Sequence, residues 1–349
     1  MDFVTHACVG ALAGRALSPA EADEAEVRGL VRLGAVAALL PDADHVLEVL
    51  SPELYLVYHR TASHSLLGVA VLALAAAWPG SAQARRLRVA VAAAALATHL
   101  VLDVATPFGT ALLWPFSSFM AATDGLPIVA PWMILLTLLL AGGAARRGRR
   151  FARGGLVGLG LLLAGTHALS SWGAGATPGG RAELCVPAWQ APYAADALAA
   201  EGEDYVHYRL VPGRPPRSVA RYPRVASEAG QPLSPARAPI PPGAPLERMR
   251  LPIARVGSDV VTHFDAQFLL IDPARRPIRV VAPCRPPFAY EVQQTAPGAQ
   301  LLLWALVLLA SLGLTRTRAA APPGDTTSGA GDSSVDAASG SDVASSGGT

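Results

Sequence analysis

The chain has 349 residues, of which 52 % are hydrophobic and 15 % are charged, and its mean hydropathy of +0.36 is positive. At this length, that composition indicates membrane segments rather than one large soluble core. All 28 basic side chains are arginine, which is typical of a GC-rich bacterial genome, and the net charge is only +2. No basic stripe with interleaved aromatic residues occurs, so the composition indicates no nucleic-acid partner.

Seven apolar segments are predicted to be helices. The first four are short and interrupted by polar residues, whereas the last three are close to the ~20 apolar residues that cross a bilayer. We expect a mainly α fold, a polytopic membrane helical bundle of about seven apolar helices. Their approximate bounds are 4–17, 27–40, 65–78, 87–104, 126–141, 154–172 and 301–314.

Arginines mark one end of these predicted helices. The run from Arg146 to Arg153 separates the fifth and sixth segments, and the positive-inside rule places that loop in the cytoplasm. The arginines between the first and second segments, and between the third and fourth, then fall on the same side. This pattern predicts a multi-pass protein of the bacterial inner membrane, with residues 173–298 outside the cytoplasm.

The region 173–298 is rich in proline and contains pieces in which β-branched and aromatic residues alternate with polar ones. These pieces lie at 204–211, 263–271 and 278–282, and they predict a small β-rich domain of two to four strands. Between the first two pieces, the Pro- and Arg-rich segment 212–245 predicts an extended loop.

The composition changes again after the last apolar segment, where Gly, Ser, Ala and Asp predict a disordered tail. Cys185 and Cys284 are the only cysteines of the β-rich region, and outside the cytoplasm they could form a disulfide. The predicted organisation is a metal-site helical bundle (1–125), a transmembrane hairpin (126–172), a β-rich extracytoplasmic domain (173–298), a C-terminal transmembrane helix (299–315) and a disordered tail (316–349).

The first 103 residues hold a set of histidines and carboxylates inside otherwise apolar segments, where an ionisable group is costly unless it is paired, coordinated or solvated. In the predicted topology they all lie at the outer end of the bundle, so side chains from different helices can converge on one metal site. The set consists of His6, Asp42, Asp44, His59, His64, His99 and Asp103.

Spacing gives two of these motifs a geometry. His99 and Asp103 are four residues apart, so they share one face of a helix and can reach the same cation. Asp42 and Asp44 are two residues apart, and the useful geometry for them is a helix end or turn, which Pro41 favours. We expect one of the two carboxylates to be a ligand and the other to be an orienting partner or general base.

His59 is predicted in the loop before the third helix and His64 at the start of that helix, with Arg60 between them as a fixed cation suited to a phosphate or carboxylate. His6 is followed by Gly10 and Gly14, which allow close helix packing. Weaker candidates are His45 and His167, while His207 and His263 are expected at the surface of the β-rich region.

The order of these motifs, followed by Gly109 and Trp114-Pro115, resembles the bacterial membrane-bound metal-dependent hydrolases of the YdjM type, over about residues 1–140. Thr61 and Ser63 depart from that pattern, but neither is a candidate ligand. The family is in turn distantly similar to the zinc-dependent phospholipase C and P1 nuclease group. The resemblance implies as metal ligands His6, Asp42, His59 or His64, His99 and Asp103, and both His59 and His64 are kept as candidates.

We therefore expect a metal-dependent hydrolase with one to three Zn²⁺ ions, or another divalent metal, on the extracytoplasmic side of the membrane. Asp44 would accept the proton of the attacking water and Arg60 would hold a phosphoryl oxygen. The expected partners are membrane lipids, and the expected substrate is a phosphoester, for which a lipid headgroup is the natural setting. Two alternatives stay open: an ion or proton carrier with a His/Asp relay, and a non-catalytic envelope protein with a structural metal.

Overall fold

Helix α1 (Phe3–Leu17) opens the chain and carries His6. Its first turn is capped by Asp2, whose carboxylate accepts the backbone N–H of Thr5. The helix lies against α2 (Glu24–Ala37) at a contact made of glycine, because a Cβ on Gly34 would come within 2.1 Å of the carbonyl oxygen of Gly10. This confirms the close packing predicted from Gly10.

The computed structural model describes residues 1–78, 81–234, 238, 245–270, 278–283, 291–294 and 298–313. The predicted tail and Cys284 lie outside the described residues, so the tail and the disulfide both stay predictions. The helices that follow α2 are η1 (Pro41–His45), α3 (Val46–Leu50), α4 (Pro52–Tyr58), α5 (Leu66–Ala77), α6 (Ala82–Val104), α7 (Pro131–Arg147), α8 (Arg149–Ala176) and α9 (Ala299–Gly313).

Two apolar cores hold the helices together. Leu12 of α1 packs with Leu102 of α6 and with residues of α7 and α8. On the other side of α6, Leu96 packs with Leu33 of α2 and with α5. Helix α6 therefore packs against both cores. This packing holds the end of the helix that carries His99 and Asp103.

The prediction of a polytopic bundle with about seven spans is wrong. Among the described residues, only two helices are long and apolar enough to cross a membrane, Ala84–Val104 in α6 and Arg149–Ala176 in α8. Helices α1 and α9 have 15 residues each and α5 has 12, fewer than the ~20 that a bilayer requires. Composition misled because a helix that is apolar on nearly all sides, such as α1, can equally be buried against other helices.

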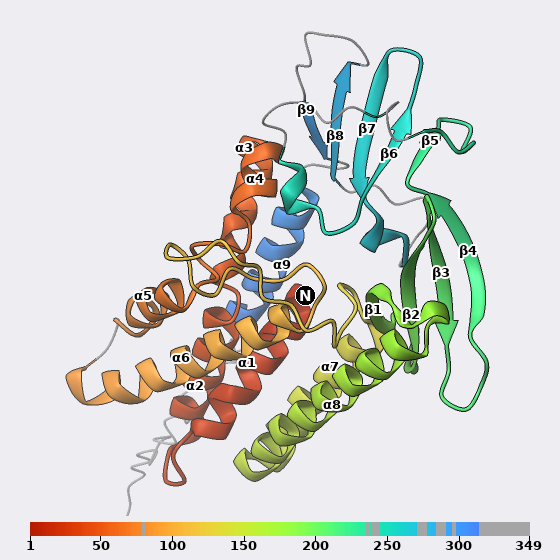
Figure 1. The fold of residues 1–349 in the computed structure, drawn as a ribbon. Helices are drawn as coiled ribbons and strands as arrows, with labels where there is room; N and C mark the ends of the chain where they lie inside the picture. The colour runs from red at the N-terminus through yellow and green to blue at the C-terminus, as the bar shows by residue number, and fades with distance from the viewer. Residues whose placement is uncertain are drawn as a thin grey trace, which may run out of the picture. The chain divides into compact units, whose positions relative to one another are not determined.

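The fold is mixed, with helices followed by two sheets (Figure 1). Helix α8 leads directly into an antiparallel sheet ordered β1-β2-β3-β4. Its strands are β1 (Ala182–Ala188), β2 (Ala191–Glu201), β3 (Asp204–Leu210) and β4 (Arg217–Pro223). The second sheet is ordered β5-β6-β7-β8-β9, with β5 parallel to β6 and the other pairs antiparallel. Its strands are β5 (Val225–Ser227), β6 (Pro252–Val256), β7 (Val260–Asp265), β8 (Ile278–Pro283) and β9 (Glu291–Gln294).

The sheets exceed the predicted two to four strands, and the predicted extended loop at 212–245 contains β4 and β5. Prolines misled the prediction, because they lie in or beside these strands: Pro223 ends β4. The short 3-10 helix η5 (Ala266–Leu270) follows β7 and contributes Phe268 to a cavity described below.

Candidate metal centre

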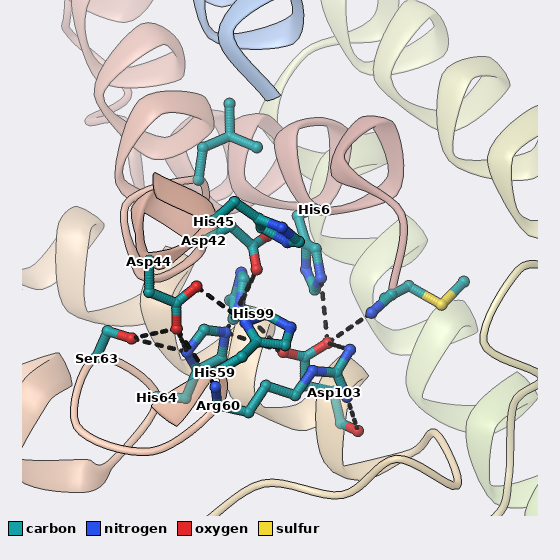
Figure 2. A network of polar contacts seen from close by, with 12 residues as sticks. His6, Asp42, Asp44, His45, His59, Arg60, Ser63, His64, His99 and Asp103 are labelled. Atoms are coloured by element: carbon teal, nitrogen blue, oxygen red, sulfur yellow. Dashed lines mark hydrogen bonds and ion pairs between the residues drawn. The ribbon is translucent and has the colours of Figure 1, made fainter. Parts of the chain in front are cut away.

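Asp103 occupies the centre of the polar cluster in Figure 2 and is fully buried near the end of α6. Its Oδ1 atom lies 2.8 Å from Nη2 of Arg60 and 2.7 Å from the amino group of Met1. Its Oδ2 atom lies 3.2 Å from Nε2 of His99 and 3.3 Å from Nε2 of His64. One carboxylate oxygen is therefore held by cations, while the other faces two imidazoles.

His99 lies one helical turn before Asp103, on the same face of α6, as the spacing predicts. Its Nδ1 atom is 2.7 Å from the carbonyl oxygen of Ala38. Because a carbonyl only accepts hydrogen bonds, Nδ1 carries the ring proton and donates it. The Nε2 lone pair then points at the carboxylates, which is the orientation that a metal ligand requires.

Asp42 comes from η1, the 3-10 helix that begins at Pro41, so the predicted irregular backbone at this proline is confirmed. The Asp42 Oδ1 atom lies 3.4 Å from Nε2 of His64 and 3.9 Å from Nε2 of His99. Asp42 therefore approaches the same two Nε2 atoms, of His64 and His99, as Asp103 does.

His6, on α1, contacts both His99 and Asp103. Its ring stacks on His99 with centroids 3.8 Å apart, and its Nε2 lies 3.3 Å from Oδ1 of Asp103. Neither ring nitrogen of His6 has a hydrogen-bond partner among the described residues. A fully buried imidazole in that state is costly unless a further group joins it.

The cluster as a whole fits a divalent metal. Ligand atoms of four buried residues, Asp42, His64, His99 and Asp103, all lie within 4.8 Å of one another, and five buried ligand atoms of these residues and His6 have no hydrogen-bond partner among the described residues. Imidazole nitrogens and carboxylate oxygens are the donors that zinc and related metals take in proteins. These atoms are Nε2 of His6, His64 and His99 and Oδ2 of Asp42 and Asp103.

Asp44 lies beside this cluster and contacts the far side of two histidines. Its Oδ1 is 2.9 Å from Nδ1 of His59, and its Oδ2 is 3.4 Å from Nδ1 of His64. The Ser63 hydroxyl donates to the same Oδ2 at 3.0 Å. A carboxylate on Nδ1 orients an imidazole so that Nε2 can bind, so Asp44 occupies the place of an orienting partner.

The charges of this pair follow from burial and proximity. Burial lowers the pKa of His59 to about 4, although Asp44 opposes that shift. Burial alone would raise the pKa of Asp44, but His59 and His64 outweigh it and hold that pKa well below its usual range. At neutral pH the pair is therefore a neutral imidazole beside a carboxylate.

A second group of possible ligands adjoins the first, with ligand atoms of Asp44, His45 and His59 all within 4.8 Å of one another. His45 was only a weak candidate, and Glu48, whose carboxylate contacts Nδ1 of His45, was missed. Their three-residue spacing on a helical segment was the available signal, but a single His-Glu pair of this kind is common on solvated helices.

Arg60 is buried, with a positive φ of 61°. Besides its ion pair with Asp103, it donates from Nη1 to the Thr106 hydroxyl at 2.9 Å, and its guanidinium lies 5.1 Å from the Phe108 ring centroid. Its Nε–H has no hydrogen-bond partner among the described residues. The fixed cation predicted here is present, and most of its donors hold Asp103 and the loop after α6.

Three other histidines lie apart from the cluster. Nδ1 of His167 is 2.7 Å from the carbonyl oxygen of Thr123. His207 and His263 are buried in the sheets, so the expectation that they lie at the surface is wrong. They face the interior side of their strands, and Nε2 of His207 is 3.0 Å from Asp196.

No curated protein and no solved structure matches the chain. The distant similarity to the phospholipase C and P1 nuclease group therefore stays a prediction from the order of the ligands. One family model does match, described as YdjM inner membrane protein, over residues 1–173, which include every member of the metal cluster. The chain accordingly belongs to the YdjM family of inner membrane proteins through this N-terminal half.

Proposed function

We propose that this protein is a membrane-bound metal-dependent hydrolase of phosphoester bonds. The proposal is supported chiefly by one observation, the convergence of ligand atoms from four buried residues, all within 4.8 Å of one another, beside a cavity of about 390 Å³. A purely structural metal site is closed by its protein ligands, whereas a catalytic site keeps access for water and substrate. Asp42, His59 and Arg60 line that cavity, which favours catalysis.

The proposed ligands are the four residues whose ligand atoms converge, together with His6, whose ring stacks on His99 and whose Nε2 lies 3.3 Å from Asp103. A bound Zn²⁺ ion would supply Lewis-acid chemistry and make water acidic enough to act as a nucleophile near neutral pH. Of the two histidines that the family resemblance leaves as ligands, we assign His64 to this set because its Nε2 is buried and unpartnered. The full proposed set is His6, Asp42, His64, His99 and Asp103.

His59 and Asp44 have a different proposed role. His59 lines the cavity while its Nδ1 contacts Asp44, so a proton accepted on the cavity side of the imidazole would be stabilised by the carboxylate behind it. Asp44 itself does not line the cavity, so we propose that it accepts the proton of the attacking water through His59. The unpartnered Nε–H of Arg60 is the proposed donor to a phosphoryl oxygen.

The arrangement favours an enzyme over an ion carrier. A relay needs polar groups spread through the depth of a membrane, whereas these groups gather at one end of α6. We propose that this end faces outward, because α6 and α8 both carry arginines at their N-terminal ends. Membrane lipids are then the proposed partners, and a lipid headgroup is the proposed setting of the phosphoester.

The test is a paired measurement of metal content and hydrolysis. Arg60→Lys keeps a charge near Asp103 but removes Nε–H and the planar fork, so we expect bound metal and a hydrolysis rate reduced by roughly 10². Arg217→Lys, on the exposed strand β4, is the matched control and should leave both unchanged. The substrates are p-nitrophenyl phosphate, its bis-ester and phospholipid vesicles. A zinc-loaded wild-type protein that hydrolyses none of them would overturn the proposal.

A further inference from the structure

The cavity beside the metal cluster is lined by both polar and apolar side chains. The polar lining includes Asp42, His59 and Arg60. Most of the remaining wall is apolar, and the one carboxylate outside the metal cluster, Asp2, is already occupied in capping α1. The apolar wall includes Phe3, Val129, Ile134, Phe268 and Leu303.

Part of this wall comes from outside the region that matches the YdjM family. Phe268 belongs to η5 and Leu303 to α9, whereas the family match ends at residue 173. Helix α9 is fixed beside the site, because the Trp304 indole N–H donates to the carbonyl oxygen of Leu39 at 2.8 Å and its ring packs near Phe3. The family region thus supplies the ligands, and the C-terminal region completes the cavity.

Helices α7 and α9, which contribute Ile134 and Leu303 to the cavity wall, carry exposed apolar side chains on their other sides. In an inner-membrane protein, exposed apolar surface of this extent is expected to contact lipid. The cavity is therefore bounded by helices whose other faces are suited to the bilayer. The exposed leucines are Leu135, Leu138 and Leu139 on α7 and Leu302, Leu306 and Leu309 on α9.

We propose that this cavity binds the apolar chain of a membrane amphiphile that has a single chain and an anionic phosphate head. A volume of about 390 Å³ suits one chain segment and a small head rather than a whole two-chain phospholipid. A head group that accepts hydrogen bonds is favoured, because Arg60 lines the cavity and has a buried Nε–H without a hydrogen-bond partner among the described residues. The choice of a phosphate head rests on the proposed function, whereas binding of the chain does not require turnover.

Binding is measured on the full chain in detergent, both metal-free and zinc-loaded, with a lysophosphatidic acid that carries a photoreactive group in its acyl chain. We expect crosslinks to Phe268 or Leu303. Ile134→Trp should weaken binding about tenfold by excluding roughly two methylene groups. Leu135→Trp, the neighbouring residue on α7 with 59 % exposure, is the matched control and should bind like wild type. Unchanged metal content and unfolding temperature verify that both variants fold.

Two further probes separate the sources of affinity. A monoacylglycerol with the same chain should bind more weakly than the phosphate amphiphile, and inorganic phosphate more weakly still. Equal binding to wild type and Ile134→Trp would overturn the inference, whatever the hydrolytic activity. Loss of binding in Ile134→Trp, in a protein that hydrolyses no phosphoester, would uphold the cavity assignment and reject the proposed function.

Discussion

Asp103 and Asp42 belong to the same candidate metal site, but the structure gives them different surroundings. One oxygen of Asp103 is paired with the Arg60 guanidinium at 2.8 Å, and both side chains are buried. Asp42 has no comparable arginine partner among the described residues, and its nearest group in the cluster is His64 at 3.4 Å. Replacing each carboxylate by its amide should therefore have the same effect on metal binding but a different effect on the metal-free fold.

The size of the difference follows from the buried pair. Removing one partner of a buried ion pair costs about 3–5 kcal/mol, because the remaining charge is left without compensation. For a cooperative unit of about 300 residues, that cost lowers the unfolding temperature of metal-free Asp103→Asn by roughly 5–8 °C. Asp42→Asn removes a 3.4 Å contact with His64 that is not a hydrogen bond, so we expect a cost of about 1 kcal/mol at most and an unfolding temperature within about 2 °C of wild type.

The assay is thermal unfolding followed by intrinsic fluorescence, on detergent-purified protein treated with a chelator. The same samples are then incubated with zinc, and bound metal is measured by mass spectrometry. Both variants should bind less zinc than wild type. An equal loss of stability in the two metal-free variants, or none in Asp103→Asn, would refute the assignment of Arg60 as the partner that stabilises Asp103.

Two further predictions concern the helix that carries His6 and the orientation in the membrane. Gly34→Val should lower the free energy of unfolding by about 1–3 kcal/mol and reduce metal content, because its Cβ would come within 2.1 Å of the Gly10 carbonyl oxygen. The control is Gly29→Val, which has no atom within 4 Å of its Cβ and should change neither quantity. With the native cysteines replaced, an impermeant maleimide applied to intact spheroplasts should label Arg181→Cys but not Arg150→Cys, and the opposite pattern would reverse the proposed orientation.

The candidate metal site could be predicted in part because local helix geometry fixes the relative positions of some of its residues. A spacing of four on one helix places His99 and Asp103 on one face whatever surrounds the helix, and the structure confirms this. The close approach of α1 was likewise visible in Gly10. The pairing of Arg60 with Asp103 joins residues 43 positions apart in sequence, and no local spacing encodes it.

The membrane spans and sheets were harder to predict because an apolar segment can either face lipid or pack inside the protein. Leu12 and Leu33 are buried between helices, and a sequence cannot distinguish such contacts from contacts with lipid. Strand β2 (Ala191–Glu201) is rich in alanine, which favours helices, and becomes a strand because it pairs with β1 and β3 on both sides. Tertiary pairing overrides local preference there.

The division of the site between two regions has a consequence for how such a protein can vary. All proposed ligands precede residue 104, whereas Phe268 of η5 and Leu303 of α9 line the cavity from outside the region that matches the family. Helix α9 also packs against Phe3 and Leu39, beside the segments that carry His6 and Asp42, so loss of the whole helix would disturb both regions. Single substitutions of Phe268 or Leu303 change the apolar wall and leave every proposed ligand in place. Under the proposed function, they should therefore alter selectivity for the chain of the substrate more than affinity for the metal.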